Sequence, residues 1–249
     1  MRILLVNPNM TQSMTDAMAA VARKVAGDRA EIVPLTAPRG FPYIASRAEA
    51  QVAGAITLEM IAENLDGVDA VVIAAFGDPS LAGAKELFDI PIIGMAEAAV
   101  MTAAMLGERF SIVTFSPVMT RWYTDCVMDS GLGSRFAGVR TPDIHAGNVA
   151  DAARDMRGEL VKLAQHAVAV DGADVVILGG APLAGLAPEI DGEIPAIVID
   201  PIASAVAQAM SLASLGVRFD GRACKPVAKA SVGLSVALAQ VISRDMQAL

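Results

Sequence analysis

The feature that most constrains this chain is an internal repeat, because two segments of its first half return in the same order in its second half. Residues 7–11 (NPNMT) return 109 positions later as residues 116–120 (SPVMT). Residues 69–75 (DAVVIAA) return 105 positions later as residues 174–180 (DVVILGG). Such a duplication predicts two similar lobes that face each other across a pseudo-twofold axis. Matching loops of the two lobes should then line one cleft, where we look for a functional site.

Short apolar runs rich in β-branched residues alternate with segments of helical periodicity along the chain. The runs predict strands at residues 3–6, 30–35, 70–75, 90–94, 109–115, 137–141, 175–179 and 196–200. Because these strands are continuously apolar and are separated by helices, they indicate parallel sheets covered on both faces. We therefore predict an α/β fold of two pseudo-symmetric Rossmann-like lobes with parallel sheets and a cleft between them. The first lobe is expected to comprise residues 1–98 plus 206–249, and the second residues 99–205.

Two of the helical segments carry clear signals. After the first predicted strand, Met14, Met18 and Ala22 fall on one face of a helix, which should pack on the sheet. Ser46, followed three residues later by Glu49, predicts a capping box at the start of another helix. In open parallel sheets ligands bind beyond the carboxyl ends of the strands, so the loops after the strands form the candidate site.

Composition excludes several classes of function. The formal net charge of −8 argues against a nucleic-acid partner, because phosphate binding needs a basic surface. Hydrophobic residues make up 54% of the chain, yet no uncharged run is long enough to span a membrane. No signal peptide is recognisable after the first residues, so we expect a cytoplasmic protein. Cys126 and Cys224 are the only cysteines and have no metal-site spacing, so we expect no metal.

Polar side chains follow the first predicted strand of each lobe. Asn7 and Asn9 offer side-chain amides, and the backbone N–H groups of a helix start, to a carboxylate or a ureide carbonyl. Alternatively, these asparagines only cap the helix. Thr114 and Ser116 supply the equivalent hydroxyl groups in the second lobe. These opposed loops predict a small polar ligand, most simply an anion.

The sequence resembles the aspartate/glutamate/hydantoin racemase superfamily, most closely its hydantoin and allantoin racemase branch. The resemblance covers most of the chain and lies in residues 3–11, 74–81 (AAFGDPSL), 93–99 (IGMAEAA), 109–114, 178–181 (LGGA) and 184–186 (AGL). It implies an enzyme without a cofactor that acts on a small carboxylate or a cyclic ureide, and a homo-oligomer. It also implies that Tyr43, Phe76, Gly77 and Ala181 border the substrate.

In that family two cysteines face each other across the cleft, one just before the Phe-Gly-Asp-Pro segment and one inside a Gly-Cys-Ala turn. One thiolate removes a proton from the stereocentre while the other thiol delivers a proton to the opposite face. The corresponding residues here are Ala75 and Gly180, which also pair in the internal repeat. Neither residue can transfer a proton. Cys126 and Cys224 are expected in a helix and in the C-terminal tail, away from the cleft.

Other titratable groups are the candidates to replace the thiols. Asp78 follows the first lost cysteine by three residues, Glu97 follows a predicted strand, and Tyr123 and His145 lie in the second lobe. Each has a structural alternative. Asp78 would cap the helix that begins at Pro79, Glu97 would anchor backbone amides or lie between the lobes, and His145 would be a solvated loop residue.

Three hypotheses remain open from the sequence. The first is a cofactor-independent enzyme whose acid and base are not thiols. Isomerisation needs a group on each face of the carbon, so the loss of both thiols shifts this hypothesis toward a lyase or hydrolase reaction, with a racemase that uses other acid and base residues as the alternative. The second is a non-catalytic protein that binds a small anion. The third is a chain in which the thiols were replaced deliberately.

Overall fold

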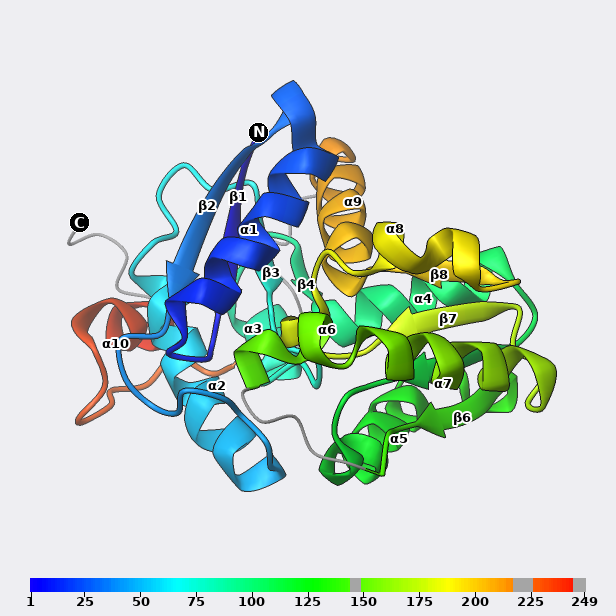
Figure 1. Ribbon diagram of the computed structural model, residues 1–249. Coiled ribbons are helices and arrows are strands. Elements are labelled where there is room, and N and C mark those ends of the chain that lie inside the picture. Colours follow the sequence, from blue (N-terminus) through cyan, green and yellow to red (C-terminus); the bar gives the residue numbers. More distant parts are fainter. Residues whose placement is uncertain (144–148, 217–225, 244–249) are drawn as a thin grey trace.

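The computed structural model describes residues 1–143, 149–216 and 226–243 (Figure 1). His145 and Cys224, which the sequence analysis considered, lie outside the described residues. Each of the eight predicted strands is present, and the strands form two four-stranded sheets. The prediction of an α/β fold with two parallel sheets is confirmed.

The first sheet has the strand order β2-β1-β3-β4, and all of its pairs are parallel. Its strands are β1 (Arg2–Asn7), β2 (Glu31–Thr36), β3 (Ala70–Ile73) and β4 (Ile92–Gly94). The helices between them are α1 (Gln12–Ala26), α2 (Arg47–Ala62) and α3 (Leu81–Leu87). The central strand β3 is buried along its whole length because helices cover both faces of the sheet.

The second sheet repeats this arrangement, with the order β6-β5-β7-β8 and parallel pairs. Its strands are β5 (Phe110–Val113), β6 (Phe136–Arg140), β7 (Val175–Leu178) and β8 (Ile197–Ile199). The accompanying helices are α5 (Thr120–Asp129), α6 (Ala152–Asp155), α7 (Arg157–Ala169) and α8 (Ala187–Ile190). The matching strand orders of the two sheets are the structural form of the internal repeat.

The two helix signals in the sequence are also found. Met14, Met18 and Ala22 are buried on one face of α1. At the start of α2, the Ser46 hydroxyl accepts the Glu49 N–H at 3.2 Å. The Glu49 carboxylate returns to the N–H of Ala45 at 2.6 Å, one residue before the position that a standard capping box uses.

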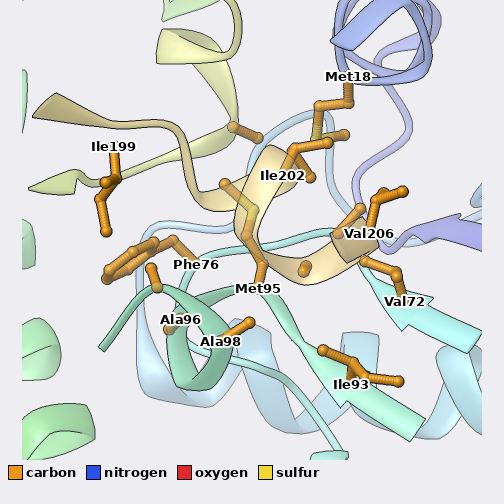
Figure 2. Close-up of a cluster of buried hydrophobic side chains, with 14 of the residues drawn as sticks. Met18, Val72, Phe76, Ile93, Met95, Ala96, Ala98, Ile199, Ile202 and Val206 are labelled. Atoms are coloured by element: carbon orange, nitrogen blue, oxygen red, sulfur yellow. The ribbon is translucent and has the colours of Figure 1, made fainter. Parts of the chain in front are cut away.

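Two helices, α4 (Met95–Leu106) and α9 (Pro201–Ser214), hold the sheets together. They pack side by side, and α4 contacts both β4 and β7. The Gln208 amide of α9 donates to the Ala98 carbonyl and to the Thr102 hydroxyl of α4, each at 2.9 Å. One buried cluster therefore draws side chains from both sheets and from both helices (Figure 2). The proposed lobe boundaries, after residues 98 and 205, fall inside these two helices and remain a proposal.

The last described helix, α10 (Val236–Ser243), contacts α2 and buries Leu238. None of the described helices is both long enough and apolar enough to cross a bilayer.

Candidate functional site

A small cavity lies at the carboxyl ends of the central strands of both sheets. Asn9 reaches it from the loop after β1, Ala75, Phe76 and Pro79 follow β3, and Ala181 follows β7. The lining residues are Asn9, Tyr43, Ile44, Ala75, Phe76, Pro79, Trp122, Tyr123 and Ala181. The cavity volume is about 10 Å³, which is roughly what one water molecule requires. Matching loops of both halves therefore meet at one site, as the repeat predicts.

Ala75 and Gly180 occupy equivalent places on the two sides of this site. Ala75 lines the cavity and is 7% exposed. Gly180 directly precedes the lining residue Ala181 and has a φ of +122°, a conformation that side-chain-bearing residues rarely adopt. A Cβ atom at Gly180 would lie 3.4 Å from the Tyr123 hydroxyl and 3.0 Å from the ring of Phe115. The direction in which a side chain would project from position 180 is therefore already taken by Tyr123 and Phe115.

Tyr123 and Tyr43 are the titratable side chains among the described lining residues. Tyr123 projects from α5, is 1% exposed, and packs its ring against Phe76 at a centroid distance of 4.5 Å. Its hydroxyl hydrogen-bonds the Tyr43 hydroxyl. Burial raises the pKa of both phenols above the usual value of 10.0. At neutral pH both tyrosines therefore carry their protons and act as hydrogen-bond donors, not as bases.

Thr114, a predicted ligand-binding residue directly after β5, is fully buried beside this pair. Its hydroxyl lowers the pKa of Tyr123, although burial dominates that pKa. Among the described residues, the Thr114 Oγ1 atom has no partner in good hydrogen-bond geometry. The second predicted hydroxyl, that of Ser116, belongs to a half-buried residue that does not line the cavity.

Asn7 and Asn9 form an internal network in which their polar groups are already paired. The Asn7 carbonyl oxygen accepts the Asn9 backbone N–H at 3.0 Å and the Asn9 amide at 2.8 Å. The Asn7 amide donates to the Thr15 hydroxyl at 2.9 Å, and the Asn9 carbonyl oxygen accepts the Ile44 N–H at 2.8 Å. The expectation of free backbone N–H groups in this loop was wrong for Asn9, because its N–H donates to the side-chain oxygen of Asn7. Of the two asparagines, Asn9 faces the cavity.

Backbone N–H groups without a partner lie elsewhere in the site. In the part of the chain that the structure describes, the N–H groups of Phe76 and Ala181 make no hydrogen bond. Both residues line the cavity, one after β3 and one after β7. The repeat therefore places one lining residue with an unpaired backbone N–H group in each half of the site.

Asp78 caps a helix, but not the one expected. Its carboxylate accepts the N–H groups of Ala96 and Glu97, at 2.8 and 2.7 Å, at the start of α4 instead of the helix that follows Pro79. Burial raises the pKa of Asp78 to about 7, and the two N–H donors oppose that rise. Negative charge is favoured at a helix N-terminus, so Asp78 ties the loop after β3 to α4.

The remaining candidates lie outside the cavity lining. Both carboxylate oxygens of Glu97 contact the Lys85 ammonium at 2.6 Å, and the Glu97 side chain is 33% exposed. Cys126 lies in α5 and lines a neighbouring hollow, and burial raises the pKa of its thiol to about 12. Gly77 has a φ of +116°, and the ring of Trp122 lies directly against its backbone.

Comparison with known proteins assigns the chain to a family. The model of the Asp/Glu/hydantoin racemase family matches residues 3–209. The hydantoin racemase of Paenarthrobacter aurescens is 33% identical over 218 residues, which cover 87% of this chain and 92% of that protein. The chain belongs to the Asp/Glu/hydantoin racemase family.

Solved structures of this family have the same fold. The allantoin racemase from Klebsiella pneumoniae superimposes with a TM-score of 0.89 at 32% identity, covering 95% of this chain and 98% of that one. The allantoin racemase of Pseudomonas fluorescens gives a TM-score of 0.86 at 32% identity, covering 94% and 100%. The two-lobed arrangement is therefore that of the racemase family.

Two lining residues of this racemase-family protein were missed from the sequence. Trp122 and Ile44 both face the cavity. Trp122 is the single tryptophan of the chain and directly precedes Tyr123, which was the available signal. Ile44 offered none, because its position depends on the long-range hydrogen bond from its N–H to Asn9.

Proposed function

We propose that this chain is a cofactor-independent enzyme of the racemase family that acts on a small carboxylate or a cyclic ureide without the two-thiol mechanism. In this proposal, Ala75 and Gly180 stand where racemases of the family carry their two cysteines. One observation carries the proposal: the side-chain direction of Gly180 meets the Tyr123 hydroxyl, whereas Ala75 places only a methyl group on the other wall. The site then has a proton donor on one face of the substrate carbon.

A donor on one face suits a reaction that delivers one proton. Racemisation requires a base on one side of the carbon and an acid on the other, and burial raises the pKa of Tyr123, so at neutral pH it is protonated and supplies no base. In a decarboxylation, the bond between the substrate carbon and its carboxylate breaks and carbon dioxide leaves. The electron pair remains on the carbon, which takes the proton of Tyr123, and water returns a proton to the tyrosinate. The role predicted for Tyr123 is therefore that of a general acid.

The free N–H groups of Phe76 and Ala181 support the same reaction class. Negative charge that develops on a carbonyl oxygen next to the reacting carbon is stabilised by donors that are already oriented. These two donors come from opposite halves of the repeat. No described lining residue carries a charged side chain, so the ligand is held by neutral donors. This favours a cyclic ureide, or an acid whose carboxylate leaves during the reaction.

A non-catalytic small-anion binder is the second candidate, and one observation favours it. The described lining residues include no group that is a base at neutral pH, since burial keeps both tyrosines protonated. A binder requires the donors and no base. A racemase that uses other acid and base residues is the further alternative, and it requires a base from outside the described lining residues.

A screen in deuterium oxide separates these functions. Hydantoins, allantoin and small 2-substituted acids are incubated with the protein, and each mixture is followed by proton NMR and by thermal unfolding. A new product supports the lyase or hydrolase proposal, and deuterium exchange with racemisation of recovered substrate supports a racemase. A ligand that raises Tm without product or exchange supports the binder. The proposal is overturned if the product forms equally fast with the Tyr123→Phe variant.

A further inference from the structure

Trp122 lines both this small cavity and a second, more open hollow. The hollow has a volume of about 250 Å³ and is lined by residues of α2, of the loop after β3 and of α5. Trp122 and Pro79 line both spaces. The other residues that line the hollow are Arg47, Ala50, Gln51, Gly77, Asp78, Ser80, Asp125, Cys126 and Asp129. The cavity itself holds about 10 Å³, too little for any organic ligand.

The indole ring of Trp122 lies on the backbone of Gly77. A Cβ atom at Gly77 would come within 2.4 Å of the ring, so this close contact depends on glycine. Trp122 also packs against a small apolar cluster, which includes Ile44 and Ala53 of the first half of the chain. Trp122 belongs to the second half, so its ring closes the gap between the two halves.

An ion pair spans the hollow next to this ring. Arg47, the first residue of α2, pairs with Asp125, which lies in α5 three residues after Trp122. The two side chains are 47% and 49% exposed. Ion pairs as exposed as this contribute little to stability and are screened by salt, so the contact opens at low cost. The Arg47–Asp125 ion pair can therefore form and break while the rest of the fold stays intact.

We propose that Trp122 is the gate of the cavity, that the Arg47–Asp125 pair latches it, and that ligands enter through this hollow. A ligand the size of a hydantoin enters only when the ring moves off Gly77 and joins the two spaces. The size of the side chain at position 122 then sets the largest ligand that the site accepts. This inference rests on the proposed function only in taking the cavity as the ligand site.

Because Trp122 is the single tryptophan, its fluorescence reports the gate without any ligand or turnover. Quenching by acrylamide is measured for the wild type, Asp125→Asn and Arg47→Gln, at low and at high sodium chloride. The gate predicts that each variant raises the quenching constant and shifts the emission to the red. It also predicts that salt raises the wild-type constant toward that of the variants, and that the double variant adds nothing to the single ones.

Glu193→Gln is the matched control, because Glu193 forms an exposed ion pair with Arg157 that lines neither space. This variant should leave the quenching of Trp122 unchanged. Circular dichroism and Tm identify any variant that fails to fold, in which case the salt dependence of the wild type decides. The gate is overturned if quenching is insensitive to salt and to both latch variants, or if Glu193→Gln raises it equally.

A second measurement tests the size limit. Trp122→Phe and Trp122→Ala are compared with the wild type for binding of hydantoin and of 5-benzylhydantoin by calorimetry. The expected result is a shift of preference toward the larger ring as the side chain shrinks. An unchanged ratio of affinities contradicts the size limit. If neither compound binds any form, the chosen ligand class is wrong, and the quenching experiment decides the gate by itself.

Discussion

At the scale of single residues, the proposal depends on the hydroxyl of Tyr123. With this hydroxyl the residue can donate a proton, and without it the residue is only a packed aromatic ring. Tyr123→Phe removes this hydroxyl and its hydrogen bond to Tyr43, so we expect a loss of about 1 kcal/mol in unfolding free energy. The product-forming activity should fall to background. Chemical denaturation and product assays measure the two effects.

Tyr43→Phe is the control for that prediction, because it breaks the same hydrogen bond and keeps the Tyr123 hydroxyl. It should lose a similar amount of stability and retain more activity than Tyr123→Phe. Equal loss of activity in both variants would show that the pair acts only by shaping the site.

Gly180 provides a second residue-scale prediction. A side chain there must adopt a φ of +122° beside Phe115, so Gly180→Ala should cost about 1–3 kcal/mol in unfolding free energy. Gly158→Ala is the matched control, because it lies in α7 with open space around its Cβ position, and it should gain about 0.5–1 kcal/mol. Equilibrium denaturation checks both, and equal effects would contradict the strain argument.

The same strain bears on restoring the proposed thiols. Cysteine at positions 75 and 180 should raise racemase activity only if the loop after β7 rearranges, because the present conformation at Gly180 disfavours any side chain. Chiral chromatography of a hydantoin incubated with the double variant measures this. Efficient racemisation with an unchanged loop structure would contradict the account.

At the scale of elements, Asp78 joins the loop after β3 to the start of α4. Burial raises its pKa from 3.8 to about 7, so between these pH values the folded protein holds a proton that the unfolded chain has released. The contribution of Asp78 to the unfolding free energy should therefore be highest below pH 4. It should fall by about 2–4 kcal/mol as the pH rises to 7.

Asp78→Asn removes the titrating group and retains an oxygen that accepts an N–H from α4. The unfolding free energy of the variant should lose this part of its pH dependence. The measurement is the difference between the unfolding free energies of the wild type and the variant, taken at each pH from 4 to 8. A difference that does not change with pH would show that Asp78 titrates at its usual value.

At the scale of the whole molecule, the internal repeat explains why the fold could be predicted from the sequence. The contacts within the site could be predicted less well. Strand positions follow from local apolar runs, and the duplication places their loops at one cleft. By contrast, Asn9 is oriented by Ile44 and Asp78 by Ala96, and both partners lie far away in the sequence. Local patterns predict which side chains follow a strand but not which distant N–H groups they bind. For the same reason, Asp78 was expected to cap the helix that begins at Pro79, whereas it caps α4.

The assembly is a prediction that also belongs to this scale. We expect a homo-oligomer, so light scattering coupled to size-exclusion chromatography should give a mass that is a multiple of 25.7 kDa. A mass of one chain at micromolar concentration would contradict it.

The central claim is that the site delivers a proton from one face only, and the stereochemistry of deuterium incorporation tests it directly. A compound that the protein converts is incubated in deuterium oxide, and the product is resolved by chiral chromatography and mass spectrometry. The account predicts one deuterium in a single configuration at the reacting carbon, no deuterium in recovered starting material, and loss of this product with Tyr123→Phe. A racemic deuterated product, or recovered starting material that is both racemised and deuterated, would contradict it.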